Sequence, residues 1–503
     1  MKQLNWYQIF GNTHTIPEGS TVTPTDDVQI LLHCANIWDK SYTTIGEVIA
    51  DDDTLFLTLI DNNAIDYLVR STTFASSIVA DESAMQYIGA SDYTSDTLLS
   101  DSTWLTAISG SAYRDYVLNA SVPTMTSNTT PEGVVTASSF YNDPTHYPWQ
   151  SFDSDTTSTG WEAAVNQTTN QWLQYEFTRP ITLKEFKLKN FAGRLKDYRI
   201  EASNDNFDNE TVILYTGQYP NSATLISECI NNTTAYKYYR IYCLNTYGGN
   251  YLGYMYLLRF NGREVGGVQS WLKAGGITNK KYTTVSEVLS DLTTLATLMS
   301  STDAIDYLVT AKGWATEICS DSNAMADIGM NNYAANTLLA DETWCKAIGS
   351  SAYFASVLNV SVPVMTSDTQ PYGTVTYSSQ VSPYYGFYAF DQANSQGWCD
   401  TGYRYSVDSW IAYEFPSAVK IYKAHILIRY DSSSNTMKGK IQAGNDNVDM
   451  GSFTEVTSSD NDGVDVFINN PLLEKKWRLI STQAMANTNS NGMKIQFYGR
   501  KDI

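Results

Sequence analysis

The sequence contains little of the chemistry that metal sites and nucleophilic active sites need. Its 503 residues include four histidines and six cysteines, and no cysteines stand in a CxxC or other zinc-site spacing. No nucleophile-elbow motif is present. Cys229 and Cys243 could pair, but scattered cysteines are usually buried thiols. We therefore expect neither a zinc site nor a catalytic triad, and we predict that the chain is not an enzyme.

Positive charge and long apolar runs are also scarce. Lysine and arginine together number 32 against 53 acidic residues, which gives a net charge of −21. Nucleic acid and anionic membrane surfaces attract a basic face, so neither is an expected partner. No stretch of about 18 apolar residues could span a bilayer, and the N-terminus lacks the apolar core of a secretion signal.

Charged residues make up only 17% of the chain, whereas hydrophobic residues make up 43%. This composition is typical of packed globular domains and not of disordered chains. The polar surface must come mainly from Ser, Thr, Asn and 36 tyrosines, whose rigid amphipathic rings suit binding surfaces.

A long internal repeat is the strongest positive feature of the sequence. Val28-Gln29 recurs at Val268-Gln269, and Val122-Pro123 recurs at Val362-Pro363 with the same spacing. No gap is needed between these points, so a whole folding unit has been duplicated.

A shorter period of twenty residues recurs within each copy, as at Asp61, Asp81 and Asp101. Each period is predicted to form two short helices whose first turn is capped by the aspartate. Gly89 and Gly329 are expected to end helices as left-handed C-cap residues. Helices of roughly 8–10 residues do not persist alone, so they must stack on one another.

Other signals mark where the helical segments begin and end. Thr44 and Glu47 fit a capping box at the start of the first segment. Pro123 and Pro363 end the two segments, because proline breaks a helix. Apolar and polar positions then alternate between Asn, Asp and Gly turns, which is typical of antiparallel sandwiches.

Residues 1–27 differ from the rest of the chain. They combine an apolar head around Trp6 with a turn-rich stretch that contains Pro17 and Pro24. An attachment arm would have this composition, and a terminal strand on the neighbouring domain would explain it equally well.

The predicted fold class is α+β multidomain, in which two small all-α helical-hairpin repeat modules alternate with two antiparallel β-sandwich domains. The expected segments are the arm 1–27, helical modules 28–120 and 266–360, and sandwiches 121–265 and 361–503.

Five motifs recur in the same order in both β-regions. The first region has Phe152-Asp153, Trp161, Trp172–Phe177, Ser203–Asp205 and Phe260–Gly262, and the second has Phe390-Asp391, Trp398, Trp410–Phe415, Asn445-Asp446 and Phe497–Gly499. In this order they resemble discoidin domains, also called factor 5/8 type C domains, a family that includes carbohydrate-binding modules. The resemblance implies a galactose-binding jelly-roll fold with a glycan held in the loops at one end. Trp161, Trp172, Trp398 and Trp410 are expected in the core.

A sugar site needs an aromatic face for the ring and fixed polar groups for the hydroxyls. For any single loop aromatic, packing on its own scaffold is the commoner explanation. The candidate glycan-binding residues are His146, Tyr147, Trp149, Arg194, Tyr247 and Tyr251 in the first region, and Tyr384, Tyr385, Tyr403 and Tyr405 in the second.

In many discoidin-like domains the loop after the FD pair also holds a structural calcium ion. Asp153 and Asp155 offer the oxygen ligands that calcium prefers, and Asp391 is the second region's counterpart. The family often adds a glutamate from the last strand. Leu257 and Lys494 stand near that position here, which weakens the calcium prediction.

The helical segments resemble parts of bacteriophage virion proteins, in which repeats of the type D-x-x-A-M-x-x-I join β-modules. The resemblance implies a structural component of a fibre, appendage or adsorption apparatus that assembles in the host cytoplasm. Its implied partners are other virion proteins, through residues 1–27, and host surface polysaccharide. A homo-oligomer in the particle would raise weak affinities by avidity.

Three alternatives stay open. The sandwiches could be purely architectural parts of a virion. The chain could accompany a carbohydrate-active enzyme, because a catalytic carboxylate pair about 5–9 Å apart is visible only in three dimensions. A bacterial surface adhesin is the third alternative, although it should carry an export signal.

Overall fold

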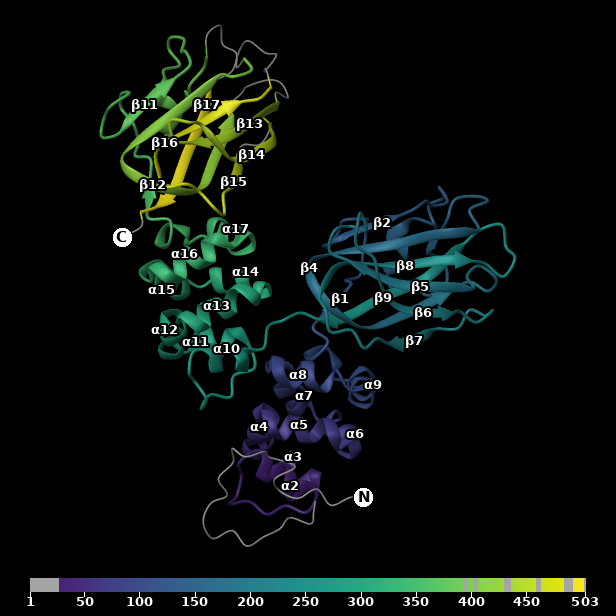
Figure 1. Cartoon of the computed structure of the whole chain (residues 1–503). Coiled ribbons are helices and arrows are strands. Elements are labelled where there is room, and N and C mark those ends of the chain that lie inside the picture. Colours follow the sequence, from purple (N-terminus) through teal and green to yellow (C-terminus); the bar gives the residue numbers. More distant parts are fainter. Residues whose placement is uncertain are drawn as a thin grey trace. The chain divides into compact units, whose positions relative to one another are not determined.

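The computed structural model describes residues 27–392, 396–400, 406–428, 436–457, 463–483 and 492–501 (Figure 1). The chain divides into two compact units, Met1–Ser270 with Asn279–Thr284, and Trp271–Thr278 with Val285–Ile503. Each unit contains short helices followed by antiparallel sheets, so the mixed helical and antiparallel β fold is confirmed. The division into five segments stays a prediction, and residues 1–26 of the expected arm lie outside the described residues. No helix in the described part of the chain is long and apolar enough to cross a membrane.

The helices of the first unit are short because polar N-caps recur between them. Asp61, Asp81 and Asp101 each accept hydrogen bonds from backbone N–H groups of the first helical turn, as predicted. Thr44 and Glu47 form the predicted capping box. The helices are α2 (Asp27–Cys34), α3 (Ile45–Ala50), α4 (Asp52–Ile60), α5 (Asn62–Arg70), α6 (Ala75–Ile78), α7 (Glu82–Ala90), α8 (Asp92–Leu98) and α9 (Ser102–Gly110).

The second unit repeats this arrangement of helices. Helix α12 packs against α13 and α15, as α4 packs against α5 and α7 in the first unit. The helices are α10 (Val268–Ala274), which contains the boundary between the units, α11 (Val285–Ser290), α12 (Leu292–Ser300), α13 (Thr302–Thr310), α14 (Ala315–Cys319), α15 (Ser322–Met330), α16 (Asn332–Ala340) and α17 (Glu342–Ser350).

Gly89 and Gly329 are not the C-caps that the sequence predicts. They lie inside α7 and α15, and neither has a left-handed backbone. A Cβ atom at either position would come within 2.0 Å of a carbonyl oxygen, that of Tyr116 or that of Ser356. Glycine is required here because another segment of backbone passes directly against the helix.

The strands of the first unit form two sheets that share one long strand, β4. Its first half pairs with β2 and β8, and its second half pairs with β7 and β9, with a register shift between Glu176 and Ile181. The strands are β1 (Ala120–Ser121), β2 (Val134–Ala137), β3 (Trp161–Glu162), β4 (Thr169–Asn190), β5 (Asp197–Ser203), β6 (Val212–Gln218), β7 (Ile226–Cys229), β8 (Tyr236–Asn245) and β9 (Gly253–Arg263).

The second unit has the same strand order, with β12 in the place of β4. Its strands are β10 (Val360–Ser361), β11 (Thr374–Tyr377), β12 (Trp410–Ile428), β13 (Thr436–Ala443), β14 (Val448–Thr457), β15 (Val464–Phe467), β16 (Glu474–Ser481) and β17 (Met493–Arg500).

Two of the four tryptophans expected in the sandwich cores lie there. Trp161 and Trp398 are fully buried. Trp172 and Trp410 are only half-buried, because side chains alternate along a strand and these two point outward. A guanidinium covers part of each ring, that of Arg240 at 5.7 Å from the Trp172 ring and that of Arg478 at 5.6 Å from the Trp410 ring.

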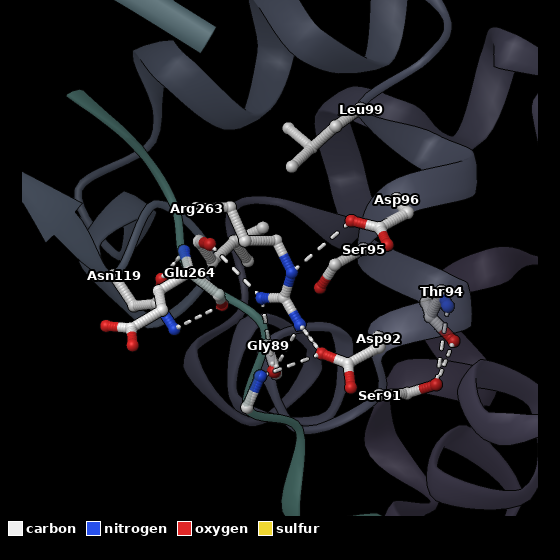
Figure 2. A network of polar contacts seen from close by, with 12 residues as sticks. Gly89, Ser91, Asp92, Thr94, Ser95, Asp96, Leu99, Asn119, Arg263 and Glu264 are labelled. Atoms are coloured by element: carbon white, nitrogen blue, oxygen red, sulfur yellow. Dashed lines mark hydrogen bonds and ion pairs between the residues drawn. The ribbon is translucent and has the colours of Figure 1, made fainter. Parts of the chain in front are cut away.

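A buried arginine joins the helices of the first unit to its sandwich (Figure 2). Arg263 ends β9 and is 3% exposed. Its guanidinium donates to the carbonyl oxygens of Gly89 and Val117 and lies 2.7 Å from a carboxylate oxygen of Asp92. Because Asp92 begins α8, one side chain fixes β9 against two helices.

The second unit contains the same junction. Arg500 ends β17 and donates to the carbonyl oxygens of Val357 and Gly329, at 3.1 and 2.9 Å. Its third acceptor is the neutral Oδ1 of Asn332, at 2.7 Å. Arg263 also lies 3.6 Å from Asp96, and the repeat has Asn332 and Asn336 where the first unit has Asp92 and Asp96.

Candidate functional site

Three segments of the first sandwich meet at one end of β3. The Ser151 hydroxyl, in the 3-10 helix η4 (Pro148–Phe152), donates to the Met255 carbonyl and accepts from the Trp161 backbone N–H, at 2.6 and 2.9 Å. The loop after β4 joins them because the Gly253 N–H donates to the Arg194 carbonyl at 3.1 Å. These bonds place Glu162, the residue after the buried tryptophan, between η4 and this loop.

The buried carboxylate of Glu162 lies between the side chains of Arg194 and His146. Its side chain is 6% exposed, with Arg194 Nη1 3.4 Å from Oε1 and His146 Nε2 3.5 Å from Oε2. On its other edge, His146 Nδ1 lies 3.2 Å from Asp143 and 2.9 Å from Thr145 Oγ1. Burial raises the pKa of Glu162. Within the described part of the chain, Glu162 Oε1 is buried and accepts no hydrogen bond, so its interaction with Arg194 is an ion pair at 3.4 Å.

Aromatic rings surround this carboxylate. The Arg194 guanidinium lies 4.8 Å from the Tyr251 ring, and the Tyr254 ring lies 4.7 Å from that of His146. Tyr254 also stacks on Phe191, which is 42% exposed. The backbone of Tyr254 is left-handed, with φ of 59°, a strained conformation of the kind that clusters at functional sites. We call the following group the Glu162 cluster: Tyr141, His146, Glu162, Arg194, Tyr251 and Tyr254.

Three of the six candidate residues of the first region belong to this cluster, namely His146, Arg194 and Tyr251. The other three have scaffold contacts. Trp149 packs against the sandwich core, and the Tyr247 hydroxyl donates to the Tyr219 carbonyl at 2.8 Å. The Tyr147 backbone N–H donates to the side chain of Gln150 within η4.

Sequence reasoning missed Glu162, Tyr141 and Tyr254. Glu162 directly follows the Trp161 motif, and that adjacency was the one signal that could have identified it. Tyr141 and Tyr254 join the cluster through ring contacts between segments far apart in the chain.

The second sandwich has different residues at the matching positions. Trp398 pairs with Met493 as Trp161 pairs with Met255, so Cys399 stands where the first sandwich has Glu162. Cys399 is fully buried.

The helix η7 (Gly386–Phe390) corresponds to η4, which places Tyr384 at the position of His146. Its neighbour Tyr385 stacks on Phe387 with ring centroids 5.9 Å apart. Tyr403 and Tyr405 lie outside the described residues.

In the loop after the first FD pair, the carboxylates accept hydrogen bonds from groups of the loop itself. Asp153 accepts from the Asp155 N–H at 2.8 Å and from Thr159 Oγ1 at 2.9 Å. Asp155 accepts from the Thr157 and Ser158 N–H groups, and hydrogen bonds from the Ser158 hydroxyl and these amides lower its pKa. Within the described ranges, no three His, Cys, Asp or Glu side chains are placed to hold a metal ion. This donor set does not fit the calcium ion that the resemblance implies.

Comparison with known proteins identifies the fold of the first sandwich. Residues 150–241 match a factor 5/8 type C family model described as the NedA-like, galactose-binding domain. This span contains Glu162 and Arg194. The first sandwich is therefore a discoidin-type, carbohydrate-binding-module-like domain.

The solved structures that are similar to parts of this chain include three carbohydrate-binding proteins. Chitosan-binding module 1 of a Paenibacillus sp. IK-5 chitosanase/glucanase is 23% identical over 26% of this chain and 95% of its own, with a TM-score of 0.23. The family 32 module of Clostridium perfringens NanJ, in complex with galactose, is 12% identical over 28% and 97%, with a TM-score of 0.24. A fucolectin from striped bass (Morone saxatilis) serum is 11% identical over 74% and 98%, with a TM-score of 0.25. No curated protein matches the chain.

Proposed function

We propose that the Glu162 cluster binds a glycan and does not cleave it. The observation that carries the proposal is the partly exposed Arg194 guanidinium, which the buried Glu162 carboxylate holds at 3.4 Å and which lies 4.8 Å from the Tyr251 ring. A carboxylate and a guanidinium together accept from and donate to sugar hydroxyls. The neighbouring Tyr254 and Phe191 rings can cover the C–H face of the sugar.

The arrangement of the carboxylates favours binding over hydrolysis. A glycosidase needs two carboxyl groups on either side of the scissile bond. Asp143 and Glu162 instead contact opposite edges of one imidazole, that of His146. The histidine ring therefore occupies the space in which a glycosidase would hold its substrate.

The proposed biological setting is a bacteriophage virion, in which the chain is a non-enzymatic attachment component. The resemblance of the helical segments to virion proteins supports this setting. In a particle, many copies of the chain would raise the affinity of one weak site per chain by avidity. In this setting residues 1–27 contact other virion proteins, the chain forms a homo-oligomer and the glycan belongs to the host surface.

A glycan array probed with the full chain tests the binding proposal. We expect retention on a subset of glycans, and a loss of about 10–100-fold in affinity in Glu162→Gln, because a hydrogen bond to a charged group is removed. Glu176→Gln is the matched control, since that side chain lies on β4 and pairs with Lys237 at 2.7 Å. A flat array would favour a purely architectural role, and sugar release would favour an enzyme.

A density map of the intact particle tests the proposed setting. The expected result is the chain at the particle surface with residues 1–27 inserted into a neighbouring virion protein. A particle that lacks the chain would overturn the virion assignment and leave the binding proposal standing.

A further inference from the structure

We propose that each sandwich carries its own cation for the loop after the FD pair, Arg259 in the first unit and Lys494 in the second. In this proposal the side-chain cation replaces a structural calcium ion, so the fold of the loop does not depend on divalent metal. The proposal concerns the scaffold and is independent of glycan binding.

Arg259 joins three segments of the first sandwich. Its Nη1 lies 2.6 Å from the Phe152 carbonyl oxygen and 3.2 Å from that of Pro123, and its Nη2 lies 2.5 Å from Ser154 Oγ. Ser154 has a left-handed backbone, with φ of 74°, and also contacts Thr124 Oγ1 at 3.0 Å. The guanidinium therefore fixes the end of η4, the start of the loop and the segment after β1.

The position of this charge also disfavours a metal ion. A calcium ion at the loop would compete for carbonyl and hydroxyl oxygens that already accept from Arg259. It would also lie within a few ångströms of a fixed positive charge in a half-buried setting, where like charges repel strongly. The carboxylates of Asp153 and Asp155 accept from the loop's own amides and hydroxyls.

In the second sandwich, a lysine supplies the cation that contacts the loop after the FD pair. Lys494, on β17, is fully buried, and its Nζ lies 2.5 Å from the Asp391 carbonyl oxygen. Gln496 stands at the strand position of Arg259 and donates to the Val362 carbonyl at 2.5 Å. The cation has thus moved by two residues along the last strand, which keeps it on the same face. Two independent solutions for one loop argue that a cation is required there.

Thermal unfolding of the full chain with EDTA or with calcium chloride gives the first test. A metal site saturated at a hundred times its Kd would raise the Tm of such a domain by roughly 5–10 °C. We expect no such shift, and no calcium binding by isothermal titration calorimetry. A shift of that size, or stoichiometric binding, would overturn the proposal.

Hydrogen exchange of the loop amides of Asp155, Thr157 and Ser158 gives the second test, with EDTA present throughout. In Arg259→Met we expect exchange on the order of tenfold faster than in the wild type, and in Arg259→Lys an intermediate rate. Arg199→Met is the control, because that side chain is 38% exposed on β5. Unchanged exchange in Arg259→Met would refute the role of the guanidinium. If Arg259→Met does not fold, Arg259→Lys and the calcium titration decide.

Discussion

The two sandwiches share a strand order but differ beside the buried tryptophan. The first has Glu162 between Arg194 and His146, whereas the second has the fully buried Cys399 at the matching position. A thiol accepts hydrogen bonds only weakly. The second sandwich therefore cannot offer a sugar the same carboxylate, although its scaffold is the same.

The junction between helices and sandwich shows the opposite behaviour. Arg263 and Arg500 end the last strand of each sandwich, and each donates to the carbonyl oxygen of a glycine at which a Cβ would meet another segment of backbone. Packing contacts of this kind constrain both copies equally. The two copies of the duplicated unit therefore share the junction between helices and sandwich, but they differ in the residue that follows the buried tryptophan.

The largest expected effect comes from removing the buried arginine of the first junction. Arg263→Ala leaves Asp92 without its cation and two carbonyl groups without a donor, so the first unit should lose about 3 kcal/mol of stability. Arg500→Ala leaves the neutral Asn332 and should cost about 1–2 kcal/mol. Urea unfolding of both variants measures the difference. Equal losses would show that the carboxylates of Asp92 and Asp96 contribute nothing.

The glycines test whether both copies need the same close approach. Gly89→Ala and Gly329→Ala should each destabilise their own unit by about 2–3 kcal/mol, because the new Cβ meets a backbone carbonyl. Gly110→Ala is the matched control, since a Cβ there has no neighbour within 4 Å. Differential scanning calorimetry can follow the two units. A large effect in one copy alone would show that the two junctions do not depend equally on glycine.

A smaller effect is expected from the residues that flank the two tryptophan positions. His146→Ala should weaken glycan binding about fivefold, because His146 contacts the Glu162 carboxylate. Tyr384→Ala, at the matching position of the second sandwich, should leave the affinity unchanged. Calorimetric titration with a glycan from the array measures both. The comparison fails if the two variants weaken binding equally.

The smallest effect concerns pH. Burial raises the pKa of Glu162 above its ordinary 4.5, so the folded state holds the proton more tightly than the unfolded state. This contribution to stability is present at low pH and is lost as pH rises from 4.5 through the folded pKa. The stability of Glu162→Gln relative to the wild type should therefore rise across this window. Urea unfolding between about pH 4 and 7 tests it, and the opposite trend would contradict the burial argument.

Local patterns could be predicted from the sequence wherever one segment decides the outcome. The aspartate caps and the capping box of Thr44 and Glu47 follow from short-range spacing, and the burial of Trp161 and Trp398 follows from the resemblance to discoidin domains. The repeat likewise predicted that both units would share one arrangement of helices and strands.

Features that depend on contacts between distant segments could not be predicted. Gly89 has the spacing of a C-cap in the sequence, but the structure shows that it is glycine because the Tyr116 backbone packs against it. Trp172 belongs to a core motif but points outward, because the alternation of β4 buries its neighbours instead. Arg259 carries no recognisable signal, since its acceptors are carbonyl oxygens of other segments.

The central claim is that the two sandwiches differ in binding because of Glu162. The most direct measurement is the stoichiometry of a saturating calorimetric titration of the full chain with a glycan selected on the array. The account predicts one glycan per chain in the wild type, and the same site with an affinity about 10–100-fold weaker in Glu162→Gln. Two glycans per chain, or an unchanged affinity in Glu162→Gln, would contradict it.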